Sequence, residues 1–156
     1  MKYRILTHEE LSHFEEDLKA FLIIHGIDGP LWEKMNKETP DKAVELVELF
    51  SDVILQRVYE NISFLEFRSP DSFAVLHLEN EQQSLILVKS LDTVVADLST
   101  PESIQQALSM QLSKLEFFRS TRSYPSTREM AVHQLLDQGC ILSDQSVWDM
   151  FNEMTK

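Results

Sequence analysis

The sequence predicts an α+β domain in which a three-stranded antiparallel meander is flanked by N-terminal and C-terminal helices. Apolar residues recur at steps of three and four up to about residue 58, which is the period of an amphipathic helix. Between residues 62 and 90 the period changes to two, which is typical of strands, and after residue 99 the helical period returns. Because helices and strands are segregated along the chain, a parallel sheet built from βαβ units is disfavoured.

Capping residues indicate where the N-terminal helices begin and end. Thr7 and Glu10 have the spacing of a capping box, and Gly26 can end the helix that follows because glycine adopts a left-handed conformation at little cost. Asp28 precedes a short second helix, and Pro40 suits the first turn of a third. The apolar stripe of the third helix consists of Ala43, Leu46, Val47, Phe50, Val53, Ile54 and Val58.

Three strands are predicted at residues 62–68, 72–79 and 84–90, with turns between them. Pairing across these turns gives one almost wholly apolar face, which suits packing against helices. It carries Leu65, Phe67, Ala74, Leu76, Leu78, Leu85 and Leu87. The opposite face, called the mixed face below, carries Ile62, Phe64, Glu66, Arg68, Phe73, Val75, His77, Ile86 and Val88. We expect the mixed face to be buried either by helices or by a second chain; a one-residue register slip would exchange the two faces.

Helices return in the C-terminal third, whereas the pattern of residues 91–98 is ambiguous. One helix is predicted to begin around Thr100 and Pro101, with a buried stripe of Ile104, Leu108, Leu112 and Leu115. A second is capped by Ser126 and Glu129 and can stop at Gly139. A third follows Asp144 and turns inward Val147, Trp148, Phe151 and Met154.

Length, charge and the single cysteine limit the number of domains, the type of partner and the cellular location that we expect. A chain of 156 residues with 43% hydrophobic residues predicts a single domain over residues 1–156 with a substantial core. The formal charge of −12 disfavours general binding to nucleic acid, because it repels phosphate at long range. The start of the chain lacks a signal-peptide pattern, no apolar run is long enough to span a membrane, and the lone Cys140 fits a reducing compartment. A cytoplasmic location is therefore expected.

Standard catalytic and cofactor motifs do not occur in the sequence. The five histidines lack the His-x-x-x-His step, and one cysteine cannot form a zinc knuckle, so no metal is expected. The three glycines match neither of the common phosphate-binding loops, and no cofactor is indicated. Cys140 follows a predicted helix end, where the negative end of the helix dipole raises a thiol pKa.

Two clusters could nevertheless carry chemistry. Glu66 and His77 share the mixed face with Arg68, and Lys89 lies near the end of the third strand. Glu66 and His77 are weak candidates for acid–base catalysis, and Arg68 is a candidate for binding an anion. Cross-strand charge pairing explains the same pattern more simply. Residues 117–128 contain three arginines and no acid, and this composition predicts a loop whose candidate binding residues are Arg119, Arg122, Tyr124 and Arg128. In the simpler interpretation these arginines pair with the carboxylates of the chain.

Three stretches of the sequence are similar to a family of short, acidic, cytosolic bacterial proteins that is classed as a domain of unknown function. They are residues 1–11 (MKYRILTHEEL), 49–54 (LFSDVI) and 64–70 (FLEFRSP). The resemblance covers mainly the first half of the chain and implies no substrate, cofactor or catalytic residue.

These observations favour a non-enzymatic interaction or adaptor module that acts through an acidic surface and the mixed face. The expected partner is another protein or a second copy of the chain, since exposed mixed faces and twofold pairing are common in assemblies. The alternative is an anion- or RNA-contacting factor that uses residues 119–128. A third possibility is an enzyme that uses Glu66 and His77.

Overall fold

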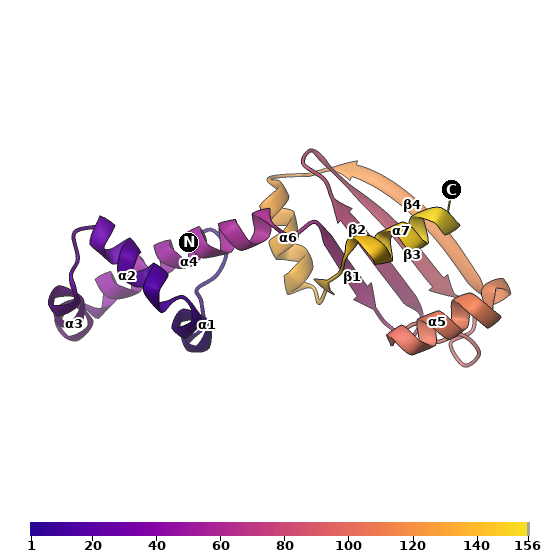
Figure 1. Ribbon diagram of the computed structural model, residues 1–156, viewed down its shortest axis with the longest axis horizontal. Coiled ribbons are helices and arrows are strands. Elements are labelled where there is room, and N and C mark those ends of the chain that lie inside the picture. Colours follow the sequence, from indigo (N-terminus) through magenta and orange to yellow (C-terminus); the bar gives the residue numbers. More distant parts are fainter. Residues whose placement is uncertain (156) are drawn as a thin grey trace. The chain divides into compact units, whose positions relative to one another are not determined.

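A computed structural model of the chain describes residues 1–155, which form an α+β fold with seven α-helices and a five-stranded antiparallel sheet (Figure 1). The helices are α1 (His8–His13), α2 (Glu15–Ile24), α3 (Gly29–Glu38), α4 (Pro40–Glu60), α5 (Pro101–Met110), α6 (Arg128–Asp137) and α7 (Gln145–Met154), with a short 3-10 helix at Leu112–Lys114. The strands are β1 (Phe64–Arg68), β2 (Ser72–Leu78), β3 (Gln82–Ser90), β4 (Leu115–Ser123) and β5 (Ile141–Leu142). None of these helices combines the length and the apolar character needed to cross a lipid bilayer.

The chain folds into two compact units, Met1–Val58 and Tyr59–Lys156. The first contains α1, α2, α3 and most of α4, and the second contains the whole sheet and the remaining helices. The single domain expected over residues 1–156 stays a prediction.

In the first unit, main-chain N–H groups of the N-terminal segment donate hydrogen bonds to side chains in the middle of α4. The Asp52 carboxylate accepts from the main-chain N–H of Lys2 at 2.6 Å and from that of Tyr3 at 2.9 Å. The Ser51 hydroxyl accepts from the Leu6 N–H at 2.9 Å. Tyr3 and Leu6 are buried and lie outside any helix or strand, so their main-chain N–H groups need hydrogen-bond acceptors. Asp52 and Ser51 supply them.

The predicted starts and stops of the N-terminal helices are confirmed, with one correction. Thr7 forms the capping box with Glu10, Gly26 adopts a φ of +75°, and Pro40 begins α4. The helix expected between Thr7 and Gly26 is in fact two helices, because it breaks at Phe14. Ser12 Oγ donates to the carbonyl of His8 at 2.8 Å, a local bond that competes with the helix ladder and favours bending.

Glu10 couples the stability of the first unit to pH. Hydrogen bonds from the Arg4 side chain and from the Thr7 main chain lower the pKa of Glu10 from 4.5 to about 2. The resulting stabilisation is complete above pH 4.5 and is lost as the pH falls toward 2. Because the pair is exposed, Glu10→Gln should lower the free energy of unfolding by about 1 kcal/mol or less at neutral pH. The difference from wild type should shrink in urea unfolding curves between pH 4.5 and about 3.

Glu9→Gln provides the matched control for Glu10→Gln. Glu9 lies in the same first turn of α1 but is exposed, and the cap does not involve its side chain. An equal loss of stability in both variants would contradict the assignment to the Arg4–Glu10 pair.

The sheet of the second unit has the strand order β4-β3-β2-β1-β5, and all neighbours are antiparallel. The predicted meander corresponds to β1, β2 and β3 and is confirmed. The prediction of only three strands is wrong, because β4 pairs with β3 over nine residues and β5 pairs with β1 over two. The second half of β4, Arg-Ser-Thr-Arg-Ser, lacks the apolar alternation by which strands are recognised, and β5 is too short to show a period.

The predicted pairing register is confirmed, and the mixed face forms the core. Glu66 lies opposite Val75, and Val75 lies opposite Ile86, so the two predicted sets of side chains do occupy opposite faces. Figure 1 shows α7 lying across the strands, and side chains of α5 and α7 pack with those of the mixed face in one core cluster. The core cluster contains Phe73, Val75, Ile86, Val88, Ala96, Leu98, Ile104, Ala107, Leu115, Trp148 and Phe151. The mixed face is therefore buried by helices of its own chain and is unavailable to a partner, which corrects the expected interaction surface.

The opposite, more apolar face is only partly covered. α6 lies over this face along β1 and β2, where Leu65, Ala74, Leu76 and Leu78 are buried. Toward β4, Leu85 and Leu87 are half-buried, and Phe118 is 47% exposed. The helices thus leave the β3–β4 side of this face open.

In the C-terminal third, two further expectations are corrected and one segment that was left open is assigned. The stripe that was expected to continue to Leu115 ends with α5 at Met110, because Leu115 begins β4. The ambiguous residues 91–98 form turns that bury Ala96 and Leu98. α6 is capped by Thr127, whose side chain accepts from the Met130 N–H, rather than by Ser126.

Candidate functional site

Glu66 and Arg68 form an ion pair on the buried face of β1. Arg68 Nε donates to Glu66 Oε2 at 2.5 Å, and its guanidinium lies 5.8 Å from the centre of the Phe73 ring. Glu66 is 4% exposed, so the pair satisfies a carboxylate that would be costly to bury alone. The simpler interpretation expected charge pairing between strands, whereas the observed pair joins two residues of the same strand, β1.

His77 lies between two aromatic rings rather than beside an acid. Its ring stacks on Phe64 with a centroid distance of 4.6 Å, and Trp148 of α7 lies at 5.4 Å. Within the described residues no hydrogen bond joins His77 to Glu66. The two candidate catalytic residues share a face, as predicted, but they do not form a hydrogen-bonded acid–base pair.

The predicted loop of residues 119–128 is instead a strand, a turn and the start of a helix. Arg119 and Arg122 lie on β4, Tyr124 lies in the turn, and Arg128 begins α6. Arg119 Nη1 donates to Asn152 Oδ1 at 2.7 Å and to Thr155 Oγ1 at 3.0 Å, at the C-terminal end of α7. Tyr124 Oη donates to the Glu79 carbonyl at 2.6 Å, which holds the β2–β3 turn, and burial raises the pKa of the Tyr124 phenol.

Arg128 joins three separate segments of the main chain. Its guanidinium donates to the carbonyl oxygens of Tyr59 at 2.9 Å and Leu78 at 3.1 Å, and also to that of Ile62. Tyr59 lies in the last turn of α4, where carbonyl groups lack helical partners. These donors are committed to the fold, so Arg128 is a structural residue in this geometry.

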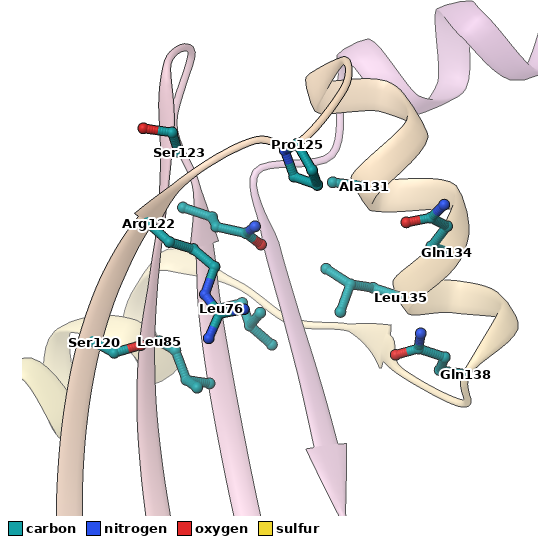
Figure 2. A pocket seen from close by; sticks show the side chains of 11 residues that line it. Leu76, Leu85, Ser120, Arg122, Ser123, Pro125, Ala131, Gln134, Leu135 and Gln138 are labelled. Carbon is teal, nitrogen blue, oxygen red and sulfur yellow. The ribbon is translucent and has the colours of Figure 1, made fainter.

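Arg122 has a different environment from the other arginines of this region. Its side chain forms no hydrogen bond or ion pair with any residue between 1 and 155, although its main chain pairs with Gln83 of β3. It lies at the edge of a cavity of about 440 Å³ between the open face of the sheet and α6 (Figure 2). The expected pairing of these arginines with carboxylates is not observed for Arg119, Arg122 or Arg128 in the described part of the chain.

A second hollow of about 360 Å³ lies on the sheet beside this cavity. It is lined by Leu85, Leu87, Lys89, Phe118, Arg119 and Ser120. Leu85, Leu87 and Phe118 form what we call the β3–β4 patch, which adjoins the edge strand β4. The patch was not recognised in the sequence, because β4 was not predicted and its side chains could not be placed.

Cys140 and the histidines show no arrangement typical of a reactive or metal site. Burial raises the pKa of the Cys140 thiol, which opposes thiolate formation. In the part of the chain that the structure describes, no group of three His, Cys, Asp or Glu side chains is placed to hold a metal ion.

A comparison with known protein families gives a match over the whole chain. The model of the Family of unknown function (DUF6495) matches residues 1–156. The chain belongs to this family. The match to the family model covers the full length of the chain, whereas the resemblance noted in the sequence lay mainly in the first half. No curated protein and no solved structure shows significant similarity to the chain.

The three stretches that carry the resemblance have structural roles in this family member. Residues 1–11 and 49–54 are joined by the hydrogen bonds of Asp52 and Ser51 to the N-terminal segment. Residues 64–70 contain the Glu66–Arg68 ion pair and a turn whose Pro70 carbonyl accepts from the Leu98 N–H at 3.1 Å. These contacts explain the stretches without assigning them chemistry.

Proposed function

We propose that the protein is a non-enzymatic interaction module that pairs with a second copy of itself along β4. The observation that carries the proposal is the open edge of the sheet. β4 is nine residues long, has β3 as its one strand neighbour in the described chain, and is exposed from Phe118 through Ser123. Long exposed edge strands offer unpaired main-chain groups to another strand, and most proteins shorten or cover them.

The side chains of β4 favour one register of self-pairing. With Phe118 at a twofold axis, the two Phe118 rings lie opposite each other on the open face, and Glu116 lies opposite Ser120 of the second copy. On the other face Phe117 lies opposite Arg119. No like charges are directly opposed between residues 115 and 121, and aromatic pairs stabilise antiparallel strands. A pairing centred on Arg119 would instead oppose two arginines.

The net charge sets the conditions for this association. Each copy carries a formal charge of −12, so two copies repel each other at low ionic strength. At physiological ionic strength, salt largely screens the repulsion between exposed charges that lie more than about 8 Å apart. The dimer should therefore strengthen as salt is added.

A disulfide test can distinguish this register from unspecific association. In a Cys140→Ala background, Phe118→Cys places two cysteines directly opposite at the axis, where Cβ atoms lie about 4.5–5.5 Å apart. Mild oxidation should give a covalent dimer on a non-reducing gel. Ser120→Cys is the matched control, because its two copies would lie about 13 Å apart along the strands. The wild-type protein should sediment as a dimer, and Phe118→Asp should sediment as a monomer.

Two results would contradict the proposal. The first is a wild-type protein that sediments as a monomer at low and at high salt. The second is equal cross-linking of the Phe118→Cys and Ser120→Cys variants, which would indicate random collision. If the protein is dimeric but Phe118→Asp does not change its mass, another surface forms the dimer.

A further inference from the structure

The cavity beside Arg122 is lined by polar side chains of β3, β4 and α6 and by apolar side chains of β2, β3 and α6. Its lining consists of Leu76, Gln83, Leu85, Ser120, Arg122, Ser123, Pro125, Ala131, Gln134, Leu135 and Gln138. Its volume of about 440 Å³ lies in the range of sites that bind small molecules. We propose that this cavity binds a small organic monocarboxylate, whose carboxylate pairs with Arg122 and whose hydrocarbon body packs on the leucines.

The charge of the lining supports an anionic ligand. Arg122 is the one ionisable side chain among the lining residues in the described chain, and no carboxylate is present there. The rest of the protein is strongly acidic, with 26 Asp and Glu against 14 Lys and Arg. A guanidinium without a protein partner, in a chain with so many carboxylates, is free to accept an external one.

The direction of the side chains supports the same assignment. Figure 2 shows the Arg122 side chain extending from β4 toward the cavity, while Gln134, Leu135 and Gln138 face it from α6. An arginine fork binds a planar carboxylate through two parallel hydrogen bonds. The carboxamides of Gln134 and Gln138 can both donate and accept, so they can bind further polar groups of the ligand.

The floor of the cavity decides between a carboxylate and a phosphate. Leu76, Leu85 and Leu135 supply an apolar surface that can bury a hydrocarbon body. Binding of a phosphate dianion would need several cationic side chains, whereas the lining provides a single guanidinium. One positive charge beside an apolar floor matches a monocarboxylate.

Binding can be measured by titration calorimetry with hexanoate and benzoate as probes. Hexanamide and benzamide are matched neutral probes of nearly the same shape. We expect the carboxylates to bind about tenfold or more tightly than the amides, because one charge-assisted interaction is worth at least that factor. Arg122→Gln should weaken carboxylate binding by a similar factor, and Arg122→Lys should fall between Arg122→Gln and wild type, because it retains the charge but loses the fork.

Lys89→Gln is the control variant, since Lys89 lies on the same open face but outside this cavity. It removes one positive charge from the sheet and should leave carboxylate affinity unchanged. The proposal would be overturned if neither carboxylate binds, if the amides bind equally well, or if Arg122→Gln binds like wild type. Inorganic phosphate that binds more tightly than hexanoate would overturn the ligand class. None of these outcomes depends on whether β4 pairs with a second copy.

Discussion

Val75→Asp is expected to unfold the second unit. Val75 is fully buried at the centre of the mixed face, opposite Glu66 on β1 and Ile86 on β3. The new carboxylate would be enclosed by the core, with the buried Glu66 as its neighbour across the strands. Burial of an unpaired charge is among the most destabilising single changes, so we expect a loss of more than about 4 kcal/mol.

The measurement is urea unfolding followed by circular dichroism, together with the dispersion of the amide resonances of residues in the sheet. Val94→Asp is the matched control because Val94 is 94% exposed, and its stability should change by less than about 0.5 kcal/mol. A Val75→Asp variant as stable as wild type would mean that α5 and α7 do not cover the mixed face in solution.

The loss of Arg128 is expected to produce the second large effect. Arg128→Met keeps the length and much of the apolar stem but removes the guanidinium donors to the carbonyl oxygens of Tyr59, Ile62 and Leu78. A hydrogen bond from a charged donor contributes about 1.5–3 kcal/mol to the free energy of unfolding. Part of this loss is offset where water can hydrogen-bond to the carbonyl group that has lost its donor. We expect the free energy of unfolding to fall by about 2–3 kcal/mol.

Arg122→Met makes the same chemical change on a neighbouring arginine that has no protein partner in the described chain. It should leave the unfolding curve nearly unchanged. If the two variants lost equal stability, the loss would reflect removal of positive charge from an acidic protein and not the contacts of Arg128. The comparison also separates the structural arginine from the one that we assign to ligand binding.

The open side of the sheet contains both surfaces for which we propose a role. The β3–β4 patch lies at the edge strand, and the Arg122 cavity lies between the same strands and α6. Leu85 and Ser120 line both hollows. The face on which we propose these roles is therefore the one opposite the mixed face, which the core occupies.

Several elements were predictable from the sequence because local chemistry determines them. Thr7, Asp28 and Asp144 cap helices whose first residues need an acceptor, and Gly26 takes a conformation that other residues avoid. The register of β1, β2 and β3 was predictable because short turns join these strands and alternating side chains allow few pairings.

The candidate site was only partly predictable. Glu66, Arg68 and His77 were placed together on one face, but the ion pair of Glu66 and the ring stacking of His77 depend on α7 and on side-chain geometry. Arg119, Arg122 and Arg128 were recognised as a group because three cations lie close together in the sequence. Their separate roles could not be read from the sequence, because a strand turns successive side chains to opposite faces and this strand was not predicted.

The α+β class, most helix boundaries and the two sets of side chains on the meander could be predicted from the sequence alone. Each of these follows from interactions between residues that are near one another along the chain. Which face forms the core depends on tertiary packing, since both faces carry enough apolar surface to pack and the choice follows from where α5, α6 and α7 lie. Tertiary structure also decided that residues 115–123 form a strand, because β3 supplies main-chain partners that outweigh a weak local preference. The open edge and the Arg122 cavity arise from that one long-range pairing.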